Sequence, residues 1–137
     1  MSLKIFIDTN VFLDSYLKRD GGIAKSIFDF LESNNIEIYL NDISIINIAY
    51  IIRKSFTKEE ITDIINLMTN QYHIVCASEK IISDANNSGF KDFEDGVQYF
   101  CAKEVKADLI ISNNKKDFTL SEIEVFSPVE FGLLYLD

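Results

Sequence analysis

Short apolar runs alternate with longer stretches of helical periodicity along the chain. The runs are rich in isoleucine, valine and other large side chains, which is typical of strands buried on both faces. They span residues 4–7, 36–40, 73–77, 108–112 and 124–126. Between them, apolar residues recur three and four positions apart, which predicts amphipathic helices. This alternation favours a single α/β domain over residues 1–137, with a central parallel sheet of four to five strands flanked by helices.

Two helix starts carry the pattern of a capping box. Thr57 is followed three residues later by Glu60, and Ser127 is followed by Glu130. Pro128 also occupies the first helical position, where a proline is favoured. We therefore expect helices to begin directly after Thr57 and Ser127.

The helix predicted between the second strand and Thr57 has a different character. It runs to about residue 54 and is apolar almost all round, so we expect it to be buried. Asp42 or Ser44 is the expected N-cap. Asn47 and Tyr50 lie in its middle, and a buried helix would need hydrogen-bonding partners for both.

The first strand, residues 4–7, ends in the polar triplet Asp8-Thr9-Asn10, and helical periodicity begins directly afterwards. In open α/β sheets, ligands bind beyond the carboxyl ends of the strands, so a carboxylate at Asp8 occupies a favoured position for a functional site. All three residues are also good helix caps. The triplet alone therefore leaves a cap and a site as equal alternatives.

The net charge restricts how the protein can meet nucleic acid. The formal net charge is −9, from 22 acidic and 13 basic residues. A chain of this charge has no general positive field that attracts phosphates. A site in which a bound cation mediates the contact is still compatible, because the cation dominates the local field.

The sequence also predicts the compartment. Cys76 and Cys101 lie in apolar runs, so both are expected to be buried free thiols of a reducing, cytoplasmic environment. No signal peptide precedes the first strand, and no apolar run is long enough to span a bilayer, so no membrane association is expected.

Acidic residues gather at three places that this fold can bring together. These are the end of the first strand, the start of one helix and the loop after the fourth strand, with residues Asp8, Asp92, Glu94, Asp95 and Asp117. If the first and fourth strands are neighbours, Asp8 and Asp117 meet at one edge of the sheet. Carboxylate oxygens suit Mg²⁺ or Mn²⁺. Each position also has an ordinary explanation, since acids favour helix N-termini and aspartate favours turns.

Other chemistries lack the residues that they need. His73 and two scattered cysteines do not form a zinc set, and no Ser-His-Asp or Cys-His constellation is evident. A phosphotransferase of the haloacid dehalogenase type would need an aspartate two residues after Asp8, where this chain has Asn10. A receiver domain would need an acidic pair before the end of the first strand, and that pair is absent.

Four stretches of the chain form an ordered set of motifs: IFIDTNVFLD, SIINIAYIIRK, KDFEDGVQYFCAKEVKADLIISNNKKDF and VFSPVEF. In content and order they resemble the PIN domain family, the nuclease fold of VapC-type toxins and of several RNA-processing enzymes. Together they extend over nearly the whole chain. The resemblance implies a metal-dependent endoribonuclease, with Mg²⁺ or Mn²⁺ as the cofactor and RNA as the substrate.

The resemblance also assigns residues. Asp8 matches the first carboxylate of the family and Asp95 matches the third. The second, usually a glutamate, falls at Asn47, which implies weakened catalysis. Many relatives have an aspartate where this chain has Asn114, and we expect Asp117 to supply that charge from the next turn.

Roles for further residues follow from this assignment. Asp8 and Asp95 would bind the metal directly, and Asp117 and Asn114 would hold or orient the water on it. The residues expected to support the site are Thr9, Asn10, Asn47, Asp92, Glu94 and Ser112, and those expected to contact phosphate are Lys115 and Lys116.

The family implies partners as well. A toxin would pair with an antitoxin protein, and a homodimer would form through Phe12, Tyr16 and Phe30 unless these side chains face the core. Because Asn47 brings no charge, the alternative function is a PIN-like interaction domain that has lost its nuclease activity.

Overall fold

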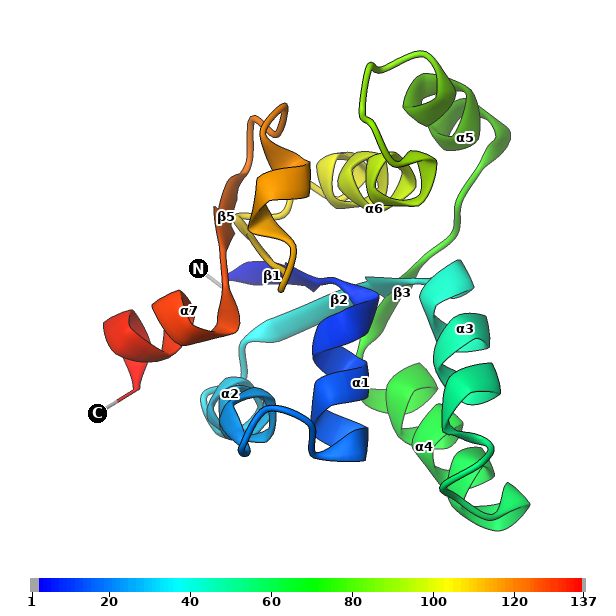
Figure 1. Ribbon diagram of the computed structural model, residues 1–137, viewed down its shortest axis with the longest axis vertical. Helices are drawn as coiled ribbons and strands as arrows, with labels where there is room; N and C mark the ends of the chain where they lie inside the picture. The colour runs from blue at the N-terminus through cyan, green and yellow to red at the C-terminus, as the bar shows by residue number, and fades with distance from the viewer. Residues whose placement is uncertain (1–2, 137) are drawn as a thin grey trace.

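A five-stranded parallel sheet forms the centre of the computed structural model, which describes residues 3–136 (Figure 1). The strands are β1 (Lys4–Ile7), β2 (Glu37–Asn41), β3 (His73–Val75), β4 (Leu109–Ile111) and β5 (Glu124–Phe126). They lie in the order β3-β2-β1-β4-β5, and every neighbouring pair is parallel. The predicted α/β class with a central parallel sheet is confirmed.

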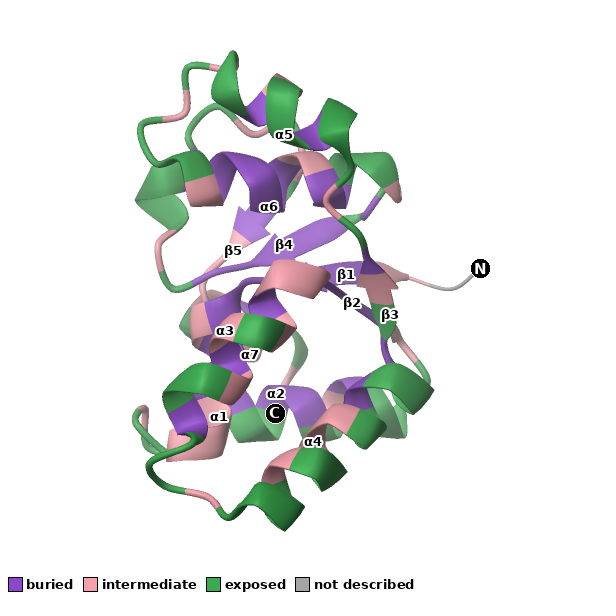
Figure 2. Ribbon diagram, turned by 90° about the vertical axis from the view of Figure 1, so that its right-hand side faces the viewer, coloured by how far each residue is buried: buried purple, intermediate pink, exposed green. Residues whose placement is uncertain are grey.

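Helices connect the strands and cover both faces of the sheet. They are α1 (Thr9–Leu17), α2 (Ile23–Ser33), α3 (Asp42–Ile52), α4 (Lys58–Gln71), α5 (Glu79–Asn86), α6 (Phe93–Glu104), the short 3₁₀ helix η1 (Lys115–Phe118) and α7 (Pro128–Tyr135). Helices α1, α2 and α4 lie on one side of the sheet, and α5 and α6 lie on the other (Figures 1 and 2). Within residues 3–136, none of these helices has both the length and the apolar character needed to cross a membrane.

The side chains of the central strand alternate between two hydrophobic cores. Ile5 and Ile7 belong to the core formed with α1, α2 and α4, whereas Phe6 belongs to the core formed with α5 and α6. All three are completely buried. A parallel strand covered on both faces has no place for a polar side chain, which explains the uninterrupted apolar run.

The pairing of β1 with β4 brings two distant parts of the chain to one edge of the sheet. Asp8 N donates a hydrogen bond to Ile111 O at 3.0 Å, and Ser112 N donates to Phe126 O at 3.0 Å. The residues that follow β1 and β4 therefore lie side by side at the carboxyl edge. This is the neighbour relation on which the expected meeting of Asp8 and Asp117 depended.

Both predicted capping boxes are present. Thr57 and Glu60 exchange side-chain and backbone hydrogen bonds at the start of α4, and Ser127 and Glu130 do the same at the start of α7. Each box satisfies two backbone N–H groups that a helix end otherwise leaves unpaired.

Helix α3 departs from its prediction. It is not buried all round, because Ile46 is 68% exposed and Tyr50 is 64% exposed. The helix packs chiefly against α1, which covers one side and leaves the other in solvent. Its N-cap is Asn41 rather than Asp42 or Ser44, and Asn41 Oδ1 accepts a hydrogen bond from Ser44 N at 2.8 Å.

Of two further expectations about apolar positions, the burial of Cys76 is wrong, and the aromatic side chains of α1 and α2 follow the alternative in which they face the core. Cys101 is buried, but Cys76 is exposed because β3 ends before it. Phe12 is buried, and Tyr16 and Phe30 are partly buried against the same core, so these aromatic side chains do not form a free dimer surface.

Candidate metal centre

Asp8 stands where β1 passes into α1, and it is the N-cap of that helix. Its backbone is extended, with φ −68° and ψ 150°, and its Oδ1 accepts a hydrogen bond from Thr9 N at 2.8 Å. Its Oδ2 accepts from Ser112 Oγ, also at 2.8 Å. The residue is only 2% exposed. The cap interpretation is therefore correct, but capping alone does not require a carboxylate to be buried this deeply.

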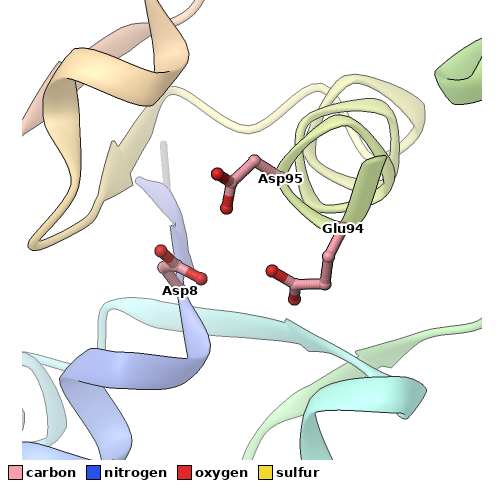
Figure 3. A group of neighbouring side chains, drawn as sticks. All are labelled: Asp8, Glu94 and Asp95. Atoms are coloured by element: carbon pink, nitrogen blue, oxygen red, sulfur yellow. The ribbon is translucent and has the colours of Figure 1, made fainter. Parts of the chain in front are cut away.

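The first turn of α6 brings two more carboxylates to Asp8. Asp92 is the N-cap of this helix, and its Oδ1 accepts hydrogen bonds from Glu94 N at 2.9 Å and Asp95 N at 3.2 Å. Glu94 and Asp95 extend from this turn toward Asp8 (Figure 3). One carboxylate oxygen from each of Asp8, Glu94 and Asp95 lies within 4.8 Å of the others.

Burial and mutual repulsion perturb this cluster. Burial raises the pKa of Asp8 to about 6, and the charges of Glu94 and Asp117 act in the same direction, while the hydrogen bond from Ser112 opposes the rise. Burial also raises the pKa of Asp95 to about 7, with Asp8 as the next cause. Negative charge at this site is therefore unfavourable near neutral pH, and a bound cation would relieve it.

A buried hydrogen-bond network lies beside the cluster, and the sequence pattern did not predict it. Gln98 Nε2 donates to Glu94 Oε2 at 2.8 Å, to Ser44 Oγ at 2.8 Å and to Thr9 Oγ1 at 3.3 Å. The hydroxyl oxygens of Thr9 and Ser44 are 2.6 Å apart. The one signal available in the sequence was spacing, because Gln98 follows Glu94 by four positions on a helix.

The segment after β4 approaches the cluster from another side. Asp117 is exposed on η1, outside the group of carboxylates that meet within 4.8 Å, yet its charge contributes to the raised pKa values of Asp8 and Asp95. Asn114 N donates to Ser112 Oγ at 3.0 Å, so the loop is tied to the residue that holds Asp8.

Other residues expected at the site are less closely connected with it. Asn47 and Asn10 are half-buried, and neither side chain forms a hydrogen bond in the part of the chain that the structure describes. The interior partners expected for Asn47 are thus absent there. Lys115 Nζ pairs with Glu130 at 3.0 Å, whereas Lys116 has no ion-pair partner between residues 3 and 136.

The donor set is compatible with a hard divalent cation. All three groups of the cluster are carboxylates, and Ser112 and the backbone of Thr9 orient the most buried of them. Mg²⁺ and Mn²⁺ prefer oxygen ligands of this kind, whereas a zinc site would use histidine or cysteine. The residues present therefore fit the metal that the motifs imply.

Comparison with known proteins establishes the family. A family model described as PIN domain matches residues 4–116. Ribonuclease VapC1 of Aquifex aeolicus (strain VF5) is 30% identical over 139 residues, a match that covers 95% of this chain and 94% of that protein. The chain therefore belongs to the PIN domain family, as its motifs led us to expect.

Solved structures share the fold. A toxin–antitoxin complex from Klebsiella pneumoniae matches with a TM-score of 0.68 at 19% identity, over 90% of this chain and 97% of the matched chain. VapBC-1 from nontypeable Haemophilus influenzae matches with a TM-score of 0.68 at 17% identity, over 93% and 99%. VapBC2 from Rickettsia felis, bound to a DNA fragment from its promoter, gives 0.65 at 17% identity, over 91% and 98%. At these identities the likeness concerns the fold alone.

Proposed function

We propose that the protein is a metal-dependent endoribonuclease that acts as the toxin of a toxin–antitoxin pair. The observation that carries this proposal is the convergence of Asp8, Glu94 and Asp95 at the carboxyl end of β1. The likeness to Ribonuclease VapC1 over nearly the full length of both chains supports RNA as the substrate.

The roles of the site residues follow from their positions. Asp8, Glu94 and Asp95 would hold Mg²⁺ or Mn²⁺. When bound, the cation activates water and offsets the charge of the scissile phosphate. Ser112 fixes one oxygen of Asp8 through the hydrogen bond at 2.8 Å, which restricts how that carboxylate faces the centre. Asp117, with Asn114, orients the attacking water from the side of η1.

Two lysines offer contacts for the RNA backbone. Lys91 and Lys116 line the same cavity of about 530 Å³ as Asp117. Neither has an ion-pair partner among the residues described, whereas Lys115 is engaged with Glu130. We therefore assign phosphate contacts to Lys116 and Lys91. Lys91 is an addition to the residues that the sequence suggested for this role.

The partner and the compartment are inferred from the relatives and the chemistry. The similar structures are described as VapBC and other toxin–antitoxin complexes, which supports an antitoxin protein as the partner and is compatible with a homodimer. We place the pair in the cytoplasm, where RNA is available and where a buried free thiol such as Cys101 stays reduced.

Metal titration tests the proposal. Mn²⁺ should raise the melting temperature of the protein, because a ligand that binds only the native state stabilises it. Asp95→Asn should remove most of that rise and should abolish Mn²⁺-dependent cleavage of single-stranded RNA. Asp63→Asn, an exposed carboxylate on α4, is the matched control and should behave as the wild type. An unchanged Mn²⁺ effect in Asp95→Asn would contradict the assignment.

One observation favours a second candidate function. Asn47 leaves the family's second carboxylate position uncharged, which is compatible with a PIN-like interaction domain without nuclease activity. This alternative predicts neither stabilisation by Mn²⁺ nor cleavage of RNA, so the same titration separates the two functions.

A further inference from the structure

Helix α6 carries a buried side-chain amide, that of Gln98, which is hydrogen-bonded to one member of the carboxylate cluster. Gln98 is 1% exposed, and its Nε2 is the donor to Glu94, Ser44 and Thr9. Its Oε1 is buried and has no hydrogen-bond partner among residues 3–136. Buried polar atoms are nearly always paired, so a side chain that stays buried with one atom unpaired requires an explanation.

The surroundings decide which way this amide points. An ionised Glu94 offers only acceptors, so the amide nitrogen must face it; the reverse orientation would bring two acceptor oxygens together. The Gln98 amide therefore fixes Oε2 of Glu94. The other oxygen of Glu94 accepts no hydrogen bond from the described part of the chain, so it is free to serve as a ligand.

Glu94 needs such an anchor. Its side chain is half-buried and has several rotatable bonds, and like charges at Asp8 and Asp95 repel it toward solvent. The amide counters this repulsion, because Gln98 is itself held by the hydroxyl groups of Thr9 on α1 and Ser44 on α3. Residues of α1, α3 and α6 thus keep the Glu94 carboxylate directed toward the cluster, and Figure 3 shows this carboxylate facing Asp8 and Asp95.

The anchor also lies next to the position where the family's second carboxylate is missing. Asn47 follows Ser44 by three residues on α3, and residues at this spacing share one face of a helix. We propose that Glu94, positioned by Gln98, supplies the third carboxylate to the metal in place of residue 47. This inference rests on the metal site of the proposed function, and Gln98 acts in it as a positioning residue.

Mn²⁺ affinity of the RNA-free protein, measured by electron paramagnetic resonance, tests the inference. Gln98→Leu should weaken Mn²⁺ binding by about 10- to 100-fold, the range typical for residues that orient metal ligands, and Glu94→Gln should weaken it at least as much, because it removes the charge of a ligand. Glu79→Gln is the control, because Glu79 is also a glutamate in the first turn of a helix but is exposed and lies on α5, away from the cluster. It should leave the affinity unchanged.

A rescue experiment separates positioning from a purely structural role. Asn47→Glu, added to Gln98→Leu, should recover most of the lost Mn²⁺ affinity because it restores the carboxylate on α3. The same addition should not recover the free energy of unfolding lost in Gln98→Leu. If Gln98 only held helices together, Gln98→Leu would lower the free energy of unfolding but leave the Mn²⁺ affinity of the folded protein unchanged, and there would be no lost affinity for Asn47→Glu to recover. Should Gln98→Leu fail to fold, Gln98→Met takes its place, and Glu94→Gln with Asn47→Glu makes the same test without any change at Gln98.

The outcomes distinguish this inference from the proposed function. If Asp8→Asn abolishes Mn²⁺ binding but Glu94→Gln does not weaken it, the metal centre stands and the role of Glu94 is overturned. A folded Gln98→Leu or Gln98→Met protein with wild-type affinity overturns the role of Gln98. If Asp8→Asn also binds Mn²⁺ like the wild type, the metal centre itself is wrong and this inference falls with it.

Discussion

Asp8 combines two roles that usually belong to different residues. One of its oxygens caps α1 through Thr9 N, and the other accepts from Ser112 across the sheet edge. A helix cap at the protein surface would keep an ordinary pKa, whereas burial raises the pKa of Asp8 to about 6. The raised pKa shows that the protein holds this charge at a cost in stability.

The first prediction concerns that cost. Without metal, Asp8→Asn should raise the free energy of unfolding at pH 8 by roughly 1–3 kcal/mol. The native pKa of about 6 lies above the ordinary value of 3.8, so the native state binds the proton more tightly than the unfolded state does. The penalty is therefore complete above about pH 6 and disappears as the pH falls toward 4. Urea denaturation in EDTA at pH 8 and pH 4.5 measures it.

Asparagine keeps the acceptor oxygen for Thr9 N, which makes Asp8→Asn the matched substitution, and Asp8→Ala would in addition lose the cap. A gain in stability at pH 8 that persists unchanged at pH 4.5 would show that the benefit does not come from removing a charge. A loss of stability at pH 8 would show that the buried carboxylate is not penalised at all.

For single residues, the sequence predicted the positions of the acidic side chains better than those of the amide side chains. Asp8 and Asp95 fall in recognisable motifs, and the structure brings both into one cluster with Glu94. Gln98 carries only the signal of its spacing from Glu94, which is weak because a polar residue on an amphipathic helix normally faces solvent. Asn47 shows the reverse: its place in a helix predicted to be buried suggested interior partners, but α3 leaves it half-buried without a hydrogen bond in the described residues.

The first turn of α6 is the element that presents two of the three carboxylates. Its geometry depends on Asp92, which caps Glu94 N and Asp95 N. Asp92 is exposed and its own carboxylate lies outside the cluster of Asp8, Glu94 and Asp95, so its contribution is to the helix start. The ordinary explanation for an acid at a helix N-terminus thus applies to Asp92.

The second prediction concerns Asp92 as the N-cap of α6. Asp92→Ala should lower the free energy of unfolding by about 1 kcal/mol, since that is the typical value of a side-chain N-cap. It should also lower the pKa of Asp95, because the charge of Asp92 is one cause of its rise. Chemical denaturation measures the stability, and NMR titration of the carboxyl carbon measures the pKa.

Asp92→Ser is the control, because serine also caps helices but carries no charge. It should keep the stability of the wild type and still lower the pKa of Asp95. If Asp92→Ser loses as much stability as Asp92→Ala, the cap is not what Asp92 contributes.

Element boundaries were predictable where the chain marks them, and burial was not. The capping boxes at Thr57 and Ser127 predicted two helix starts correctly. The exposed side of α3 could not be predicted, because isoleucines occupy nearly every face and the pattern holds no polar stripe. Helix α7 is similar: Phe131 is completely buried and Leu133 is 81% exposed in one apolar run. Tertiary packing alone decides such cases.

Across the whole molecule, the predicted strands were right but their order had to come from the structure. Apolar runs of similar composition do not specify their neighbours, so the order β3-β2-β1-β4-β5 could not be read from them. The meeting of Asp8 with the segment after β4 was accordingly a conditional expectation. The same order places β1 in the middle of the sheet, so its carboxyl end lies between β2 and β4, with helices on both faces of the sheet (Figures 1 and 2).

The third prediction concerns how a protein of net charge −9 binds RNA. If only Lys91 and Lys116 contact phosphates, the logarithm of RNA affinity should fall against the logarithm of salt concentration with a slope no steeper than about −1.4, which is two contacts at −0.7 each for single strands. Fluorescence anisotropy with a short RNA and the Asp95→Asn protein measures this slope without cleavage.

Matched lysine variants give this measurement its control. Lys116→Gln should make the slope shallower by about 0.7, since one phosphate contact is lost. Lys115→Gln should leave it unchanged, because Lys115 is paired with Glu130. A slope much steeper than −1.4, or an equal effect of the two substitutions, would show that other positively charged side chains contact the RNA.

The distance in sequence between Asp8 and its partners has a consequence during translation. Ser112 lies 104 residues after Asp8, and β4 must form beside β1 before the two side chains meet. The N-terminus of a nascent chain leaves the ribosome first, so Asp8 emerges long before Ser112 has been synthesised. For a ribonuclease, this order delays competence until most of the chain has been made. The nascent polypeptide thus passes through its synthesis, surrounded by RNA, without an assembled centre with which to cut it.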